Sequence, residues 1–184
     1  MTTITPLAIA EVLLITPKRH GDARGWFAET WSSKSLAAAG VETRFVQDNQ
    51  AFNARKGTLR GLHFQKPPHA QGKLVRVLKG AIFDVAVDLR AGSATYGRWV
   101  GATLTAEVGE QLWVPRGFAH GYVTTADDTE LFYTVDGDYA PQLEGGLIWN
   151  DPDLGIEWPL DGEPVLSDKD QILPRLKDMP KAEF

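Results

Sequence analysis

Short runs with strand character recur along this chain and limit the folds it can adopt. Turn signals such as Lys79-Gly80 and Val108-Gly109 divide them. In the N-terminal half, only residues 33–39, followed by Gly40, have the pattern of a helix. Many short strands with few helices indicate an all-β sandwich or barrel. The runs cover residues 12–15, 74–78, 81–89, 99–104, 111–114, 122–125 and 131–135.

The run over residues 81–89 shows a period of two, which predicts a half-buried strand. The residues on one face are the apolar Phe83, Val85, Val87 and Leu89. They alternate with Asp84, Ala86, Asp88 and Arg90.

The length of 184 residues fits one domain, which we expect to span residues 1–184. Within it we expect N-terminal strands and a short helix over 1–50, a core barrel over 51–140, and wrapping loops and short helices over 141–184. The last segment is rich in Pro, Asp, Trp and Gly, and it can deliver residues into a site built elsewhere.

Composition excludes several classes of function. A formal net charge of −5 argues against a general nucleic-acid binder, whose affinity comes from Lys and Arg on phosphates. The chain has no cysteine, which suits a cytoplasmic location. We find neither the features of a signal peptide nor an apolar run of the ~18 residues that a membrane span needs, so no membrane partner is expected.

The stretch GTLRGLHFQKPPHAQGK, residues 57–73, combines Arg60, His63 and Lys73. A lone strand histidine is often a core side chain bonded to backbone, with its neighbouring cations in solvent. Here two cations flank an apolar histidine, a set that suits removal of a carbon-bound proton from a phosphorylated substrate. In a regular strand Arg60 and His63 would face opposite sides, so we expect a bend or bulge at Gly61.

Further segments occur in a fixed order, and together with the previous stretch they resemble the dTDP-4-dehydrorhamnose 3,5-epimerase family of the cupin superfamily. The resemblance implies a cupin-type jelly-roll barrel with a few short peripheral helices. The segments are DARGWFAETW at 22–31, FVQDN at 45–49, GTLRGLHFQ at 57–65, AQGKLVRVLKGAIFDVAVDLR at 70–90, QLWVPRGFAHGY at 111–122, FYTVDGDYAP at 132–141, WNDPDLGIEWP at 149–159 and LSDKD at 166–170.

The implied reaction is inversion at carbons 3 and 5 of dTDP-4-keto-6-deoxyglucose, giving dTDP-4-keto-L-rhamnose. By resemblance, His63 is the base and Asp170 orients it, Lys73 stabilises the enolate, and Tyr133 donates a proton on the opposite face of the ring. A histidine suits the base because its ordinary pKa of ~6.5 leaves it neutral near pH 7.

The resemblance also implies the substrate-binding residues and an assembly. Arg24 and Glu29 are expected to come from an exchanged segment of a partner subunit, so we expect a homodimer. Tyr139 is expected to stack on thymine. The full set is Arg24, Glu29, Gln47, Asp48, Asn49, Arg60, His120, Tyr139, Glu144 and Lys169.

Neither a metal nor another cofactor is expected. The chain fits the second cupin metal motif, which ends at His120. It lacks the first, because Gln65 replaces the second histidine of a His-x-His pair and no acid follows up to Gly72.

Three alternatives stay open. Ala51 and Asp138 differ from the residues usual in the family and leave room for a mono-epimerase of deoxysugar biosynthesis acting at carbon 3 or 5. A metal-dependent cupin oxygenase or isomerase is disfavoured by Gln65. A catalytically silent sugar-binding cupin is disfavoured because a binder has no need of an acid and a base together.

Overall fold

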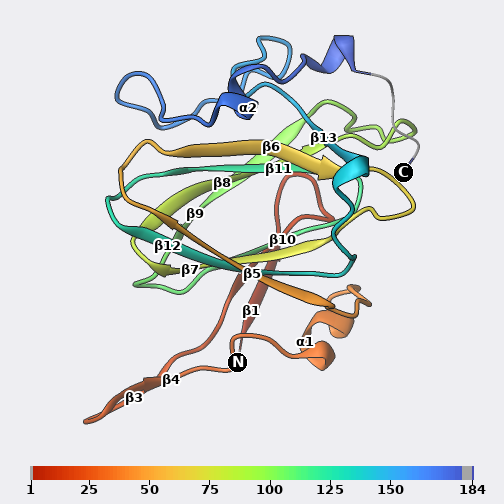
Figure 1. Cartoon of the computed structure of the whole chain (residues 1–184). Coiled ribbons are helices and arrows are strands. Elements are labelled where there is room, and N and C mark those ends of the chain that lie inside the picture. Colours follow the sequence, from red (N-terminus) through yellow and green to blue (C-terminus); the bar gives the residue numbers. More distant parts are fainter. Residues whose placement is uncertain (1, 180–183) are drawn as a thin grey trace.

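Two antiparallel sheets face each other across an apolar interior in the computed structural model, which describes residues 2–179 and 184 (Figure 1). This confirms the predicted all-β, cupin-type barrel. One sheet has the order β13 (Glu144–Gly146), β6 (Leu59–Gln65), β11 (Phe118–Thr124), β8 (Ala81–Asp88) and β9 (Trp99–Thr105). The other has the order β1 (Thr3–Pro6), β2 (Leu13–Thr16), β10 (Gln111–Val114), β7 (Lys73–Lys79), β12 (Thr129–Val135) and β5 (Gln47–Asn53).

Each of the strand-like runs in the sequence overlaps an observed strand, because hydrophobic side chains on these strands fill the barrel. Ile82, Leu112 and Leu131 are among the fully buried side chains of this core. The runs did not include β5, whose sequence QDNQAFN is mostly polar. That strand begins in the expected N-terminal segment and ends in the expected core segment.

The expectation of a half-buried strand over residues 81–89 is wrong. Asp84 and Asp88 are fully buried, as are Val85 and Val87 on the other face. The even-numbered positions face the barrel interior, where Ile82 and Ala86 join the core. The odd-numbered positions pack under the C-terminal segment, in a cluster that includes Leu147 and Leu154.

The expected N-terminal helix is confirmed to within one residue as α1 (Ser33–Ala38). Ser32 caps it by accepting a hydrogen bond from the Ser35 amide, and Gly40 follows with φ of +83°. The C-terminal segment crosses the outer side of the five-stranded sheet (Figure 1) and carries the short helices η1 (Pro141–Leu143), α2 (Asp168–Gln171) and η2 (Leu176–Asp178). None of the described helices is long and apolar enough to cross a membrane.

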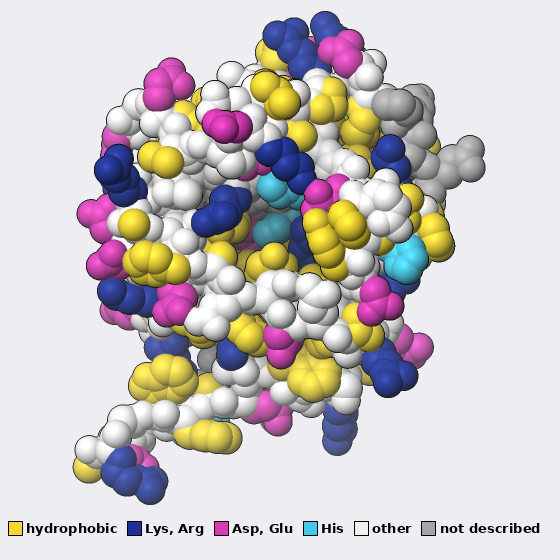
Figure 2. All heavy atoms as spheres, viewed as in Figure 1, with side chains coloured by type: hydrophobic (Ala, Val, Ile, Leu, Met, Phe, Trp, Pro, Cys, Tyr) yellow, Lys and Arg dark blue, Asp and Glu magenta, His cyan; other side chains and the backbone are white. Residues whose placement is uncertain are grey.

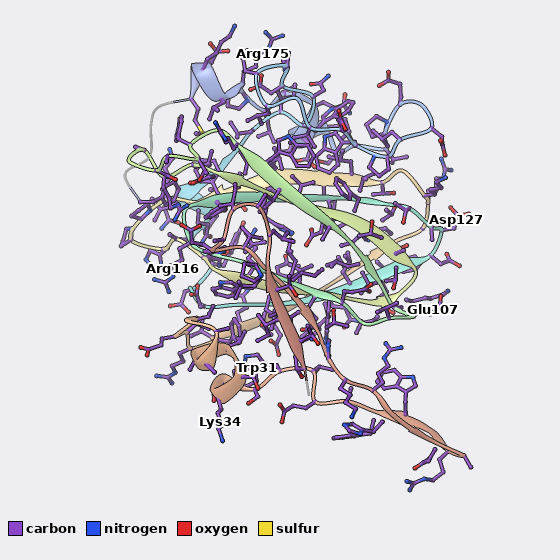
Figure 3. All side chains as sticks on the ribbon, turned by 180° about the vertical axis from the view of Figure 1, so that it is seen from behind. Trp31, Lys34, Glu107, Arg116, Asp127 and Arg175 are labelled. Carbon is purple, nitrogen blue, oxygen red and sulfur yellow. The ribbon has the colours of Figure 1, made fainter. Side chains whose placement is uncertain are left out.

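A two-stranded hairpin, β3 (His20–Asp22) with β4 (Gly25–Phe27), stands clear of the barrel in Figure 1 and again from behind in Figure 3. All six of its strand residues are exposed, and the Phe27 side chain is 72% exposed. The hairpin therefore contributes little to the core of its own chain.

Candidate active site

Two adjoining hollows, together called the central cavity here, lie between the sheets. The larger holds about 540 Å³ and the smaller about 250 Å³, and His63, Lys73 and Tyr133 line both. Figure 2 shows a hollow on this face, with histidine side chains inside it and Lys or Arg side chains around it. The imidazole comes from β6 in one sheet, whereas the lysine and the phenol come from β7 and β12 in the other. The base candidate and the acid candidate thus enter from opposite walls.

A register shift in β6 brings Arg60 and His63 to the same cavity. His120 pairs with His63 but Tyr122 pairs with Arg60, so one more residue is accommodated on β6 than on β11 between these pairs. The predicted irregularity at Gly61 is confirmed. Gly61 has φ of +116°, and a Cβ there would lie 2.7 Å from the His120 carbonyl oxygen, so only glycine fits this close approach.

Asp170 orients His63 across a sequence separation of 107 residues. Its carboxylate oxygen Oδ1 lies 2.5 Å from Nε2 of His63, and its side chain is only 4% exposed. With Nε2–H donating to the carboxylate, Nδ1 is the unprotonated nitrogen. Burial lowers the pKa of His63 below its ordinary value of 6.5, an effect that Asp170 opposes, so the imidazole is a neutral base at pH 7.

Lys73 and Tyr133 lie half-buried in the cavity wall beside this imidazole. Burial lowers the pKa of the Lys73 ammonium to about 8, which keeps most of it charged at neutral pH. Burial also raises the pKa of the Tyr133 phenol above 10.0, so the hydroxyl is protonated. The cavity therefore brings together a neutral imidazole, a mostly charged ammonium and a protonated phenol.

His120 lies deeper in the cavity than His63, and the sequence did not reveal that Asp84 is its hydrogen-bond partner. Oδ1 of Asp84 accepts a hydrogen bond from Nε2 of His120 at 2.7 Å, and the aspartate is fully buried. The signal for this buried acid was its position between Phe83 and Val85 in an apolar run. Alternation alone, however, does not tell whether that face of the strand points to the interior or to solvent.

Polar side chains that were predicted to bind substrate surround the opening. Lys169 Nζ and the Tyr139 hydroxyl both donate to the Glu144 carboxylate, at 2.5 and 3.1 Å. Gln47 donates to Asn49 at 2.8 Å on the wall of the smaller hollow. Arg60 is held by Asn53 at 2.9 Å, a contact that the sequence analysis did not foresee.

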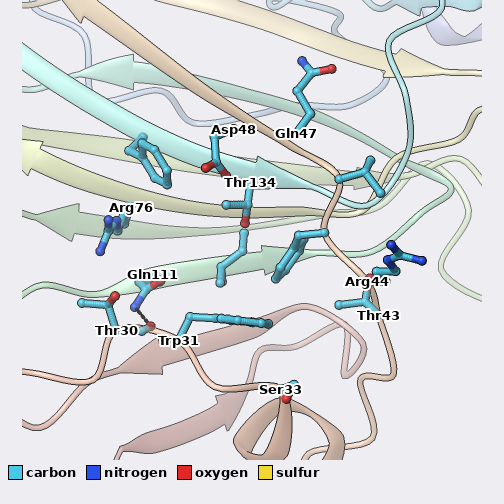
Figure 4. Close-up of a pocket in the computed structure, with 14 residues that line it drawn as sticks. Thr30, Trp31, Ser33, Thr43, Arg44, Gln47, Asp48, Arg76, Gln111 and Thr134 are labelled. Carbon is cyan, nitrogen blue, oxygen red and sulfur yellow. Dashed lines mark hydrogen bonds between the residues drawn. The ribbon is translucent and has the colours of Figure 1, made fainter.

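Three predicted binding residues are not brought to the cavity of their own chain. Asp48 lies on the opposite face of β5 from Asn49, because neighbouring residues of a strand alternate. It lines a separate hollow of about 680 Å³ outside the six-stranded sheet (Figure 4). The Arg24 side chain is 89% exposed, and among the described residues its ion-pair partner is Asp22 of the same hairpin. Glu29 lines a small crevice elsewhere.

Gln65, which replaces a metal ligand of other cupins, has a structural contact set. Its amide nitrogen donates to the carbonyls of His69 and Asp138, and its amide oxygen accepts from the Ala140 amide. Within residues 2–179 and 184, no group of three His, Cys, Asp or Glu side chains is arranged to hold a metal ion.

Comparison with known proteins gives consistent matches. A profile of the family described as dTDP-4-dehydrorhamnose 3,5-epimerase matches residues 6–178. The dTDP-4-dehydrorhamnose 3,5-epimerase of Sinorhizobium fredii is 51% identical over 174 residues, covering 95% of this chain and 89% of that protein.

Two solved structures extend the match to ligand-bound proteins. One is the crystal structure of dTDP-6-deoxy-D-glucose-3,5-epimerase from Legionella pneumophila in complex with dTDP-4-keto-L-rhamnose. It matches with a TM-score of 0.94 and 40% identity, and the match covers 100% of this chain and 99% of that chain. The crystal structure of a 3'-monoepimerase from Streptomyces bikiniensis, in complex with dTDP-quinovose, matches with a TM-score of 0.87 and 37% identity. This match covers 94% of this chain and 87% of that chain.

Proposed function

This chain belongs to the dTDP-4-dehydrorhamnose 3,5-epimerase family, and we propose that its central cavity inverts carbons 3 and 5 of dTDP-4-keto-6-deoxyglucose to give dTDP-4-keto-L-rhamnose. The observation that carries this proposal is a neutral imidazole and a protonated phenol entering one cavity from opposite sheets, with a half-buried ammonium beside them.

Both inverted carbons flank the ketone at carbon 4, so one set of residues can serve both. His63 removes the proton from carbon 3 or 5 through Nδ1, and the electrons move to the ketone oxygen as an enolate. Lys73 stabilises this oxyanion, a contribution of about 10² to 10³ in rate for a positioned donor. Tyr133 then protonates the carbon from the other face, and both groups recover their starting state by exchange with solvent.

The nucleotide part of the substrate needs positive charge at its pyrophosphate and an aromatic surface for thymine. Arg60 and Lys169, both at the larger hollow, suit the pyrophosphate, and Tyr139, 56% exposed, suits the base. Gln47, Asn49 and Glu144 supply polar contacts in the smaller hollow.

Nuclear magnetic resonance in deuterated water tests the reaction. Incubation with dTDP-4-keto-6-deoxyglucose and a coupled reductase is expected to yield a product deuterated and inverted at both carbon 3 and carbon 5. Inversion with label at one carbon would favour the mono-epimerase alternative, which the similarity to the Streptomyces bikiniensis protein keeps open. A substrate that stays unlabelled at both carbons would refute the proposed function.

The proposal extends to a homodimer in which each hairpin completes the partner's cavity. Three features support it: Arg24 does not reach its own cavity, Trp26 and Phe27 are exposed on the hairpin, and β5 is an edge strand. The hollow shown in Figure 4, lined by Trp31 and Phe132 among others, offers an apolar surface for a second copy. We also propose a cytoplasmic location, which the absence of cysteine suits.

Subunit complementation tests the exchange of hairpins. Arg24→Ala and His63→Asn are each expected to be inactive alone. When the two proteins are unfolded and refolded together, about half the dimers are mixed and each carries one intact site, so about a quarter of wild-type activity should return. No recovery in a mixture that forms dimers would mean that each hairpin serves its own barrel or that dimerisation does not complete the site.

A further inference from the structure

An acidic side chain lies on the inner face of β8, where an apolar residue would pack without the cost of burying a charge. Asp84 is fully buried and stands opposite Tyr122 on β11. One oxygen, Oδ1, accepts from His120, whereas Oδ2 is buried and has no hydrogen-bond partner among the described residues. A buried carboxylate oxygen without a hydrogen-bond partner destabilises a fold, so this aspartate calls for a functional explanation.

The opposite sheet presents Lys73 to the same interior. Its Nζ makes no hydrogen bond to the residues that the structure describes. Burial is the largest influence on its pKa and lowers it to about 8; Asp84 is the foremost of the charges that oppose this shift, ahead of Glu144 from β13. The other titratable groups that line the larger hollow are Arg60 and His63 on β6, His120 and Tyr122 on β11, Tyr133 on β12, and Lys169 and Asp170 on α2.

We propose that Asp84 is a positioning residue of this active site, an inference that rests on the epimerase function proposed above. Through Oδ1 it holds the His120 ring with its proton on Nε2, which leaves Nδ1 as a hydrogen-bond acceptor for a hydroxyl of the sugar. Through its charge it keeps the Lys73 ammonium protonated beside the ketone oxygen. Asp84 touches no reacting atom, and it acts through these two neighbours.

Asp84→Asn tests this assignment, because the amide keeps the size of the side chain and its carbonyl can still accept from His120. Without the negative charge, burial lowers the pKa of Lys73 further below 8. Lys73 acts as a cation, so the rate falls as pH rises through that pKa. The alkaline limb of the kcat profile should therefore move down by about 1 pH unit or more. The rate should fall about tenfold more at pH 9 than at pH 6.5, with little change in KM.

A matched control lies on the same strand and the same inner face. Asp88 is also fully buried, but its carboxylate accepts hydrogen bonds from Arg90, Ser93 and Thr95. Burial alone would raise its pKa, and these hydrogen bonds outweigh that effect and lower it to about 2. Asp88→Asn should lower the midpoint of urea unfolding while leaving the alkaline limb of the rate profile in place.

An equal loss of rate at every pH in Asp84→Asn would show a merely structural role and overturn the proposal. If that variant does not fold, Lys73→Arg is the substitute test. A guanidinium stays charged over the whole pH range, so the alkaline limb of the rate profile should disappear below pH 9.5. Persistence of that limb would overturn the proposal. A titration of the Lys73 amine by nuclear magnetic resonance in wild type and Asp84→Asn needs no substrate. It therefore distinguishes failure of this inference (an unchanged amine pKa) from failure of the epimerase function.

Discussion

Replacing His63 with Asn is expected to abolish both solvent-deuterium exchange and epimerisation at carbons 3 and 5. Asn has no basic nitrogen, and a positioned general base contributes about 10² to 10⁴ in rate. Because the same imidazole serves both carbons in the proposed scheme, exchange at the two positions should fall together. The measurement is loss of the carbon-bound proton signals of dTDP-4-keto-6-deoxyglucose in deuterated water, followed over hours.

His69→Asn is the matched control for this variant. His69 lies half-buried in the loop after β6, lines neither hollow of the central cavity, and engages its neighbours through backbone groups. The exchange and inversion rates of the His69→Asn variant should equal those of the wild type. Exchange in His63→Asn within tenfold of wild type, at either carbon, would show that another group removes that proton.

The barrel was largely predictable because its core strands carry apolar runs between glycine turns. Strand β8 shows the limit of that approach. Alternation predicts one buried face, but a jelly-roll strand that is covered by a C-terminal segment buries both, and the interior can then receive an acid such as Asp84. No local pattern carries this information, since the covering residues lie more than 50 positions further along the chain.

The site was predictable only in part for a similar reason. The bulge at Gly61 followed from requiring Arg60 and His63 in one site. The pairing of His63 with Asp170 followed from family resemblance, because a short helix 107 residues away supplies the carboxylate and no periodicity links the two. Asp48 shows a second limit of motif matching: it adjoins Asn49 in a matching motif, yet the strand places it on the outer face, away from the cavity of its own chain.

Replacing Tyr133 with Phe is expected to separate proton exchange from inversion. The phenol is the proposed proton donor on the face opposite His63, and its loss leaves the base, the oxyanion site and the binding residues in place. Deuterium exchange should stay within about tenfold of wild type, because His63 can return a deuteron to the face from which it took the proton. Inversion should fall by about 10² to 10⁴, the contribution of a positioned acid.

Tyr122→Phe sharpens this test, because it removes the other phenol of the larger hollow from the opposite wall. Tyr122 lies on β11, beside β6 and in the same sheet as His63, whereas Tyr133 lies on β12 in the other sheet. A donor on the base's own side cannot invert a carbon, so Tyr122→Phe should change exchange and inversion by the same factor. Label incorporation and product stereochemistry, read from the same spectra, give both rates. Parallel loss of exchange and inversion in Tyr133→Phe would contradict proton delivery from the second sheet, and a selective loss of inversion in Tyr122→Phe would reassign the donor.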